Sequence, residues 1–312
     1  MGPSRLALNR YTILMSIAWV FPGQGSQKLG MADPIISLPD AEERFALASR
    51  LLGRDLLAIC RGSDQTNHDP ADLNDTRNTQ PALFVVESLL VDELRRQGRE
   101  ASLIAGHSLG ELVALYAAEV FDVNTALLLL RRRSELMASA GGGAMTAILG
   151  FDRTQLEALV ADTEGVVIAN DNSAAQVVLS GTPEAVSKVS SQLTCKRAIP
   201  LPVSGAFHSP FMATAATEFA AELDQVTFKD ARVPVLCNAD PIPTCDANLL
   251  KQRLKDQMTT GVRWRETMDT MASQGVNTVV EIGPGNVLSG LVKRSLPGVA
   301  TIQLSCAADL GN

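Results

Sequence analysis

The pentapeptide Gly106-His107-Ser108-Leu109-Gly110 limits the possible folds of this chain more than any other feature. It matches the pattern G-x-S-x-G, in which a serine lies on a sharp turn between a buried strand and a helix. The flanking segments fit, because residues 102–105 form a short apolar run and residues 111–118 have a helical composition. Glycine is needed on both sides of the serine, where strand and helix cross closely and a Cβ would clash. We therefore predict an α/β fold that exposes Ser108 as a nucleophile.

Strand and helix patterns alternate around this turn, as expected of a large α/β domain with a parallel sheet, similar to the α/β-hydrolases. Pro81 is predicted in the first turn of a helix that runs to Arg96. Asn124 is predicted to cap the helix that runs to Met137. The apolar runs that indicate strands of this domain lie at residues 17–21, 102–105, 233–237 and 278–282. We expect residues 15–140 and 207–312 to form this domain, with helices at 210–223, 249–258 and 267–273.

Residues 141–206 have a different pattern and predict a smaller, inserted subdomain. Three glycines, Gly141 to Gly143, separate it from the preceding helix. Its predicted elements follow the order β-α-β-β-α-β, which is typical of a ferredoxin-like unit. The strands are expected at residues 144–149, 166–169, 176–180 and 197–201, and the helices at 154–161 and 182–193.

Charge and composition exclude several classes of function. The formal net charge is −7 and no dense basic tract offsets it, which argues against nucleic acid as a partner. No apolar run approaches the roughly 20 residues needed to span a membrane. The five cysteines are scattered without a C-x-x-C pair, which indicates free thiols in a reducing cytosol and no metal site. Residues 1–14 precede a second methionine and are predicted to be an N-terminal extension or an added tail, not a targeting peptide.

A serine needs a base within hydrogen-bonding distance, and the chain has only three histidines. His107 adjoins Ser108, but neighbouring side chains on such a turn diverge. His68 lies in a polar run that predicts a surface loop. His208 follows the inserted unit, where the chain returns to the large domain, and it is the remaining candidate. The group that orients this base stays open: it can be an acid, an amide or a backbone carbonyl.

Attack on an acyl group also needs backbone N–H groups that stabilise the oxyanion. The elbow geometry assigns one of them to Leu109, the residue after the nucleophile. The glycine-rich loop at residues 21–27 follows the first strand and is the natural source of the second. The same loop has neither the lysine of a P-loop nor the pattern G-x-G-x-x-G. Among residues 131–133, three arginines in one helix, one that points inward would need an anion, such as a substrate carboxylate.

Together these residues resemble the malonyl-CoA:acyl carrier protein transacylase family of fatty-acid synthesis. The similarity extends from about Ile17 to Leu304. The stretches that carry it are residues 21–27 (FPGQGSQ), 78–82 (NTQPA), 106–111 (GHSLGE) and 283–285 (GPG).

The resemblance implies a role for each matching residue. Ser108 and His208 match the acyl-accepting nucleophile and its base. Gln24 and Leu109 match the oxyanion donors, and Arg133 matches the arginine that holds the malonyl carboxylate. Gln257 matches the glutamine whose backbone carbonyl orients the histidine. His107 matches a family residue near the site that has a secondary role.

The segment Ala206-Phe207-His208 is similar to the malonyl-selecting motif of polyketide acyltransferases, although Gly205 replaces the usual first histidine. In that motif Phe207 would limit the room beside the malonyl α-carbon. The resemblance also implies a monomer with no cofactor and no metal. It makes malonyl-CoA and acyl carrier protein the partners, in the cytoplasm, or in the plastid stroma if the source is a plant or alga. Because such carriers are acidic, the cations expected at a docking rim are Arg131, Arg132, Lys196, Arg197, Lys293 and Arg294.

Three alternatives remain at this point. The chain could charge another carrier, as the malonyltransferase subunit of a malonate decarboxylase or of a polyketide system. It could be a serine esterase or thioesterase, although such enzymes place the histidine late, whereas about a hundred residues follow His208. It could also be a non-enzymatic scaffold that kept the fold.

Overall fold

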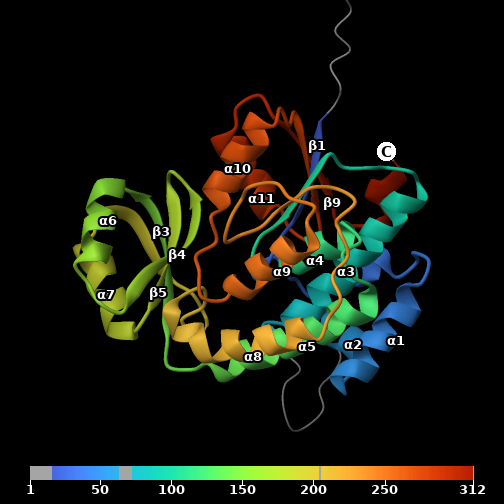
Figure 1. Cartoon of the computed structure of the whole chain (residues 1–312), viewed down its shortest axis with the longest axis horizontal. Helices are drawn as coiled ribbons and strands as arrows, with labels where there is room; N and C mark the ends of the chain where they lie inside the picture. The colour runs from blue at the N-terminus through green and yellow to red at the C-terminus, as the bar shows by residue number, and fades with distance from the viewer. Residues whose placement is uncertain (1–15, 63–71, 204, 312) are drawn as a thin grey trace, which may run out of the picture.

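The computed structural model describes residues 16–62, 72–203 and 205–311. Their strands form two separate sheets (Figure 1). The larger sheet has the strand order β7-β2-β1-β8-β9, and all of its neighbouring strands are parallel. Its strands are β1 (Ile17–Phe21), β2 (Leu103–Gly106), β7 (Val235–Leu236), β8 (Thr278–Ile282) and β9 (Ala300–Leu304). The prediction of a mixed α/β fold with a parallel sheet is therefore confirmed.

Helices cover both faces of the large sheet, because its central strands are apolar on both sides. Trp19 and Phe21 of β1 pack on one face with the helices of the N-terminal half, while Ala18 and Val20 pack on the other. The first face is covered mainly by α1 (Ala41–Leu52), α2 (Leu56–Arg61), α3 (Thr76–Arg96), α4 (Gly110–Ala117) and α5 (Val123–Ser139), with α8 (Ala213–Asp224) and α9 (Ala247–Asp256) packed beside them. The second face is covered by α10 (Trp264–Ser273) and α11 (Val287–Ser295).

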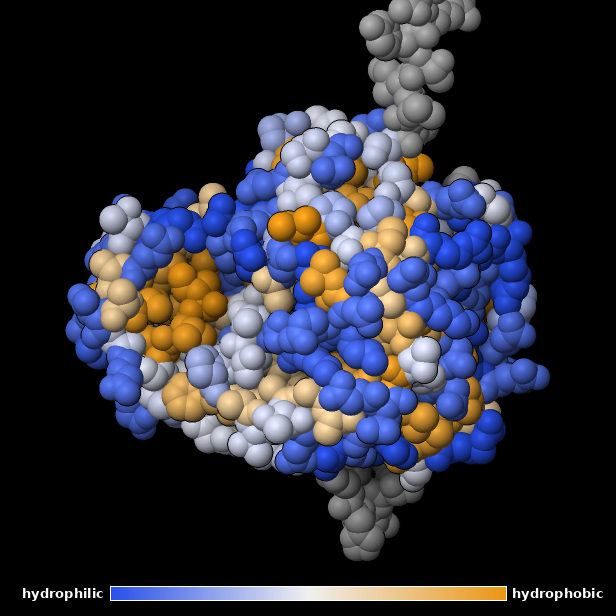
Figure 2. All heavy atoms as spheres, viewed as in Figure 1, coloured by the Kyte–Doolittle hydropathy of each residue, from blue (hydrophilic) through white to orange (hydrophobic). Residues whose placement is uncertain are grey.

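The smaller sheet is antiparallel and has the order β4-β5-β3-β6. Its elements are β3 (Ala144–Phe151), α6 (Arg153–Ala161), β4 (Val166–Ser173), β5 (Gln176–Gly181), α7 (Pro183–Gln192) and β6 (Cys195–Pro200). One face of this sheet packs on α6 and α7 through residues such as Ile148 and Val177. The residues that alternate with these along the strands, such as Ala147 and Val178, point to the opposite face and line a cavity. In Figure 2 an apolar area is visible on this unit, between its helices and its sheet.

Backbone hydrogen bonds join the small sheet to the segment that precedes α10. The N–H of Val262 donates to the carbonyl of Ala169 at 2.7 Å, and the N–H of Asp171 donates to the carbonyl of Val262 at 2.9 Å. Beside this bridge, the Asp171 carboxylate accepts from Arg153 of the small unit and from Arg265 of α10. The small sheet is therefore held against the end of the large one, and the cavity lies between them.

Several local predictions were wrong. Helix α3 begins at Thr76, where the Asp75 side chain caps it, so Pro81 lies inside the helix. Helix α5 begins at Val123, because Asp122 and not Asn124 accepts from a backbone N–H of the first turn. Aspartate is as good a cap as asparagine, and here it comes first in the chain.

Other differences concern one predicted helix that is divided and elements that were not predicted, among them strand β9. The predicted helix 210–223 is divided into a 3₁₀ turn at Pro210–Met212 and α8. Helices α1 and α2 had no counterpart in the prediction. The remaining short 3₁₀ turns are at Asp33–Ile35 and Ala307–Gly311.

The predictions for residues 1–14 and for His68 lie outside the described residues. In the part of the chain that the structure covers, every helix is too short or too polar to cross a membrane.

Candidate active site

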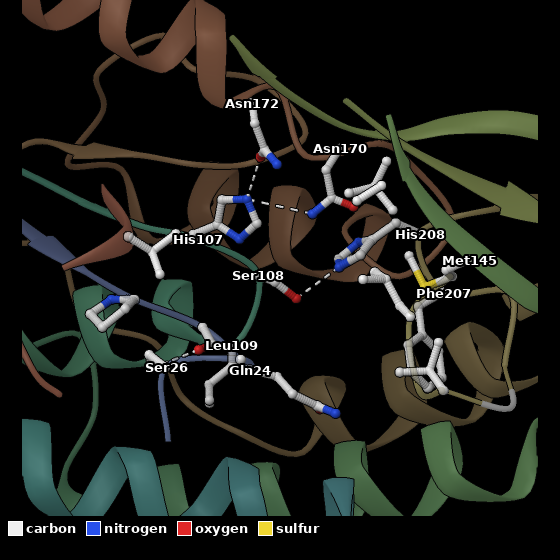
Figure 3. Close-up of a pocket in the computed structure, with 18 of the residues that line it drawn as sticks. Gln24, Ser26, His107, Ser108, Leu109, Met145, Asn170, Asn172, Phe207 and His208 are labelled. Atoms are coloured by element: carbon white, nitrogen blue, oxygen red, sulfur yellow. Dashed lines mark hydrogen bonds between the residues drawn. The ribbon is translucent and has the colours of Figure 1, made fainter. Parts of the chain in front are cut away.

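The serine lies on the predicted turn between β2, which ends at Gly106, and α4, which begins at Gly110. A Cβ at Gly106 would be 1.9 Å from the backbone of Gly110, and a Cβ at Gly110 would be 2.2 Å from the carbonyl oxygen of Phe21. Both positions are therefore restricted to glycine. Ser108 itself has a φ of 53°, in the left-handed region that a side chain rarely adopts. This conformation directs its hydroxyl into the cavity (Figure 3).

His208 is in direct contact with the serine. Its Nε2 lies 2.7 Å from Ser108 Oγ, and its Nδ1 lies 2.9 Å from the backbone carbonyl oxygen of Gln257. Because a carbonyl can only accept, Nδ1 carries the hydrogen and Nε2 of the neutral ring is free to accept the serine proton. Burial, together with the positive charge of Arg133, lowers the pKa of His208 to about 3. The imidazole is therefore neutral at pH 7, as a general base must be.

Arg133 is the arginine of the triplet that points inward, and it is only 1 % exposed. Its Nη1 donates to Gln80 Oε1 at 2.7 Å, and its Nη2 donates to Gln257 Oε1 at 2.9 Å. Nη2 also lies 3.3 Å from Ser108 Oγ. Burial lowers the pKa of Arg133 to about 10, and Glu111 opposes that shift, so the group remains a cation at neutral pH. A buried cation whose direct partners are all neutral is suited to receive an anion.

The other two arginines of the triplet are used in helix packing. Arg131 donates to the carbonyl of Leu51 at 3.0 Å. Arg132 forms ion pairs with Glu218 and Glu222 of α8, at 2.6 and 3.5 Å. The charge of Arg132 is therefore already paired, whereas Arg131 is bonded to a neutral carbonyl, and the docking rim stays a prediction.

Gln24 and Leu109 both line the cavity, and each has a backbone amide. Among the described residues, neither amide donates a hydrogen bond. Leu109 directly precedes α4, so the partial positive charge of the helix N-terminus also favours an anion here. The arrangement can hold a developing oxyanion beside Ser108.

Asn238, which was not among the predicted site residues, holds the serine turn in place. Its Oδ1 accepts from the N–H of Ser108 at 2.6 Å, and its Nδ2 donates to the carbonyl of Gly106 at 2.6 Å. Its own N–H donates to the carboxylate of Glu111, for which no role was predicted. A polar residue that follows a buried strand at the carboxyl edge of a parallel sheet was the available signal.

His107 points away from the serine and toward the small sheet (Figure 3). Its Nε2 lies 2.8 Å from Asn172 Oδ1 and 3.4 Å from Asn170 Nδ2, and both asparagines belong to β4. Burial lowers the pKa of this ring, so it is neutral at pH 7. Its contacts link the turn to the small sheet and leave the serine proton to His208.

The cavity in front of Ser108 has a volume of about 260 Å³. Phe207 forms part of its wall, and a Cβ at Gly205 would lie 2.4 Å from the Phe207 ring. The small residue at position 205 therefore makes room for that ring. Within the described residues, no three His, Cys, Asp or Glu side chains gather in a way that could hold a metal ion.

Comparison with known proteins gives consistent matches over almost the whole chain. The family model of the acyl transferase domain matches residues 18–307. The malonyl CoA-acyl carrier protein transacylase of Synechocystis sp. is 48 % identical over 298 residues, which cover 96 % of this chain and 100 % of that protein. The corresponding Escherichia coli protein (strain K12) is 41 % identical, over 90 % of this chain and 93 % of its own. The crystal structure of the Synechocystis enzyme superposes with a TM-score of 0.91, covering 95 % of this chain and 99 % of the other.

Proposed function

The chain belongs to the acyl transferase family, and on that premise we propose that it transfers the malonyl group from malonyl-CoA to acyl carrier protein for fatty-acid synthesis. The observation that carries the proposal is the position of one hydroxyl. Ser108 Oγ lies 2.7 Å from a neutral histidine nitrogen and 3.3 Å from a buried guanidinium nitrogen. A nucleophile, its base and a carboxylate-binding cation therefore meet at a single atom, as the transfer of a carboxylated acyl group requires.

In the first half-reaction Ser108 attacks the thioester carbonyl while His208 Nε2 takes its proton. The carbonyl oxygen becomes an anion and accepts hydrogen bonds from the amides of Gln24 and Leu109. Collapse of this intermediate breaks the carbon–sulfur bond. The CoA sulfur leaves with the proton from His208, and a malonyl ester remains on Ser108.

The second half-reaction runs the same steps in reverse with a different thiol. The phosphopantetheine thiol of the carrier gives its proton to His208 and attacks the ester carbonyl. The serine oxygen leaves, takes the proton back and frees the malonyl-carrier thioester. Atoms and charge balance without a metal or a redox cofactor, and we propose that the enzyme uses neither.

Arg133 and Phe207 supply the proposed selectivity for malonyl. A guanidinium can hold a carboxylate with two hydrogen bonds, and its place beside Ser108 Oγ puts a short acid chain within reach. Phe207, packed over Gly205, limits the space for a branch on the α-carbon. Gln257 orients His208 through its backbone carbonyl and supports Arg133 through its side chain.

We further propose that the carrier docks near the end of α11 and the edge strand β6. Helix α11 lines the cavity with Val287, Leu288 and Leu291, and its last turn carries Lys293 and Arg294. Lys196 and Arg197 are exposed on β6, which leads to Leu201 and Val203 at the cavity. Among the described residues these four cations have no ion-pair partner, so they are available to an acidic carrier.

The finer description of the fold belongs to the same proposal. We propose that residues 141–206 form a ferredoxin-like subdomain inserted between residues 15–140 and 207–312, which form an α/β-hydrolase-like domain. The element order and the strand order of the antiparallel sheet support this. A monomer in the cytoplasm is part of the proposal as well, and the five free thiols support a reducing location.

The test is intact-protein mass spectrometry after incubation with malonyl-CoA. We expect the wild-type chain to gain one malonyl group and Ser108→Ala to gain none. Ser139→Ala, which removes an exposed hydroxyl from another helix, is the matched control and should acylate normally. An adduct that persists in Ser108→Ala, or none in the wild type, would contradict the proposal.

The second candidate is a malonyltransferase that charges a different carrier, and the geometry around Ser108 serves it equally well. Incubating the malonylated enzyme with several purified carriers separates the two, because only the true acceptor discharges the ester rapidly. Release of free malonate without any carrier would instead indicate the esterase or thioesterase reaction.

A further inference from the structure

A chain of hydrogen bonds joins the carboxylate-binding arginine to the loop that supplies the proposed oxyanion donor. Arg133 Nη1 donates to Gln80 Oε1 at 2.7 Å, and Gln80 Nε2 donates to Thr76 Oγ1 at 2.8 Å. Thr76 Oγ1 donates in turn to Gln24 Oε1 at 2.8 Å. Each of these contacts has the length of a good hydrogen bond.

The direction of every bond in this chain follows from its first member. A guanidinium can only donate, so the Gln80 oxygen must face Arg133 and its NH₂ must face Thr76. The Thr76 hydroxyl accepts that bond and has its single hydrogen left for Gln24 Oε1. The amide of Gln24 therefore has one favoured orientation, with its oxygen toward Thr76.

Thr76 is also a rigid attachment point. It is the first residue of α3, a 21-residue helix that is largely buried, and the cap at Asp75 fixes its backbone. The loop is tied to the same segment a second time, because Gln27 Nε2 donates to Asn74 Oδ1 at 3.0 Å. Gly25, between the two contacts, has a φ of 106° that only glycine adopts easily, so the loop itself has little intrinsic stiffness.

We propose that Thr76 is a positioning residue for acyl transfer: its hydroxyl holds Gln24 so that the Gln24 backbone amide faces the oxyanion. The inference rests on the proposed function, since it assumes that an oxyanion forms beside Ser108. The Thr76 hydroxyl stabilises the transition state and does not affect the binding of malonyl-CoA, because Gln257 and Gln80 still hold Arg133 when this hydroxyl is lost.

The experiment measures the single-turnover rate constant of acylation for Thr76→Val, which keeps the shape and removes the hydroxyl. We expect a loss of about tenfold for malonyl-CoA and for acetyl-CoA alike, since both carbonyls form an oxyanion; removing a donor outright would cost about 100-fold or more. The KM for malonyl-CoA should change less than about twofold. Thr76→Ser, which restores the hydroxyl, should recover the wild-type rate constant.

A second threonine of the same helix provides the structural control. Thr79 is fully buried, and its hydroxyl bonds to the carbonyls of Leu73 and Asp75 without reaching the cavity. Thr79→Val should lower the melting temperature and the active fraction, seen as burst amplitude, and leave the rate constant unchanged.

Three outcomes overturn the inference. They are a wild-type rate constant in Thr76→Val, a loss confined to malonyl-CoA, and no recovery in Thr76→Ser. Failure of the proposed function is distinguishable, because the wild-type enzyme would then form no malonyl-serine at all.

Discussion

The two residues that exchange a proton are both held in an unfavourable backbone conformation. Ser108 has a φ of 53° and His208 a φ of 55°. Each such residue costs of the order of 1 kcal/mol or more, and it persists only where its surroundings fix it. Asn238 fixes the first through the N–H of Ser108, and the Ser209 side chain, bonded to the carbonyl of Ala206, closes the turn around the second. The strain thus lies where the reacting atoms must be placed.

Acid should destabilise the fold through His208. Its pKa is about 3 when folded and about 6.5 when unfolded, so between those values only the unfolded chain binds the proton. The free energy of unfolding therefore falls as the pH falls from about 6.5 toward 3, by up to about 1.4 kcal/mol for each pH unit. Urea unfolding at pH 7 and pH 5 measures this loss. The free energy of unfolding of His208→Gln should fall less between pH 7 and pH 5. Equal losses in the two proteins would contradict the assignment of this pH dependence to His208.

Arg133→Ala should change which acyl groups are transferred. Removing the partner of a buried carboxylate costs about 2–5 kcal/mol, so kcat/KM for malonyl-CoA should fall at least about 30-fold. Acetyl-CoA has no free carboxylate, so its kcat/KM should stay the same or rise. Parallel kinetics with the two thioesters, corrected for the active fraction, decide the matter: an equal fall for both would make Arg133 purely structural.

At the scale of elements, α3 shows how a helix accommodates a proline. Pro81 has no N–H for the carbonyl of Arg77, four residues earlier. The structure supplies the missing donor from another segment, because Arg54 Nη2 donates to that carbonyl at 2.7 Å while its Nε bonds to Asn78. The helix therefore continues through Pro81 and brings Thr76 and Gln80 to the cavity.

This compensation can be tested with two substitutions. Arg54→Met should lower the free energy of unfolding by about 1–3 kcal/mol, since the carbonyl of Arg77 loses a charged donor. In the Pro81→Ala background the same substitution should cost less, because the introduced alanine has a backbone N–H that can take over. Additive effects of the two changes in chemical denaturation would contradict the explanation.

At the scale of the whole molecule, the site exists because two sheets meet. Ser108, Arg133 and His208 come from the large unit, while β3, β4 and β5 supply the opposite wall. The backbone bridge at Val262 and the ion pairs of Asp171 hold that wall in place. Helix α11 borders the cavity with Val287, Leu288 and Leu291, and its last turn carries the two cations of the proposed docking surface, Lys293 and Arg294.

Reversing those two charges should weaken the binding of the carrier and leave the binding of malonyl-CoA unchanged. For Lys293→Glu with Arg294→Glu we expect a higher KM for acyl carrier protein, an unchanged KM for malonyl-CoA and a smaller effect at high salt. Lys188→Glu, at an exposed position of α7, is the control and should change neither constant. An unchanged KM for the carrier in the double variant would remove α11 from the docking surface.

The sequence by itself determined the serine turn, the family and the pairing of Ser108 with His208. The turn is encoded locally, because strand, glycines and helix are contiguous, and only three histidines compete for the base. The tertiary structure decided what orients that base, which is the backbone carbonyl of Gln257. Every residue has such a carbonyl, so the residue types alone could not identify it, and only the resemblance indicated Gln257. It likewise decided the parts played by Asn238 and Thr76, whose partners lie 130 and 52 positions away along the chain. Contacts at that separation depend on how the sheets and helices pack, and no local pattern records them.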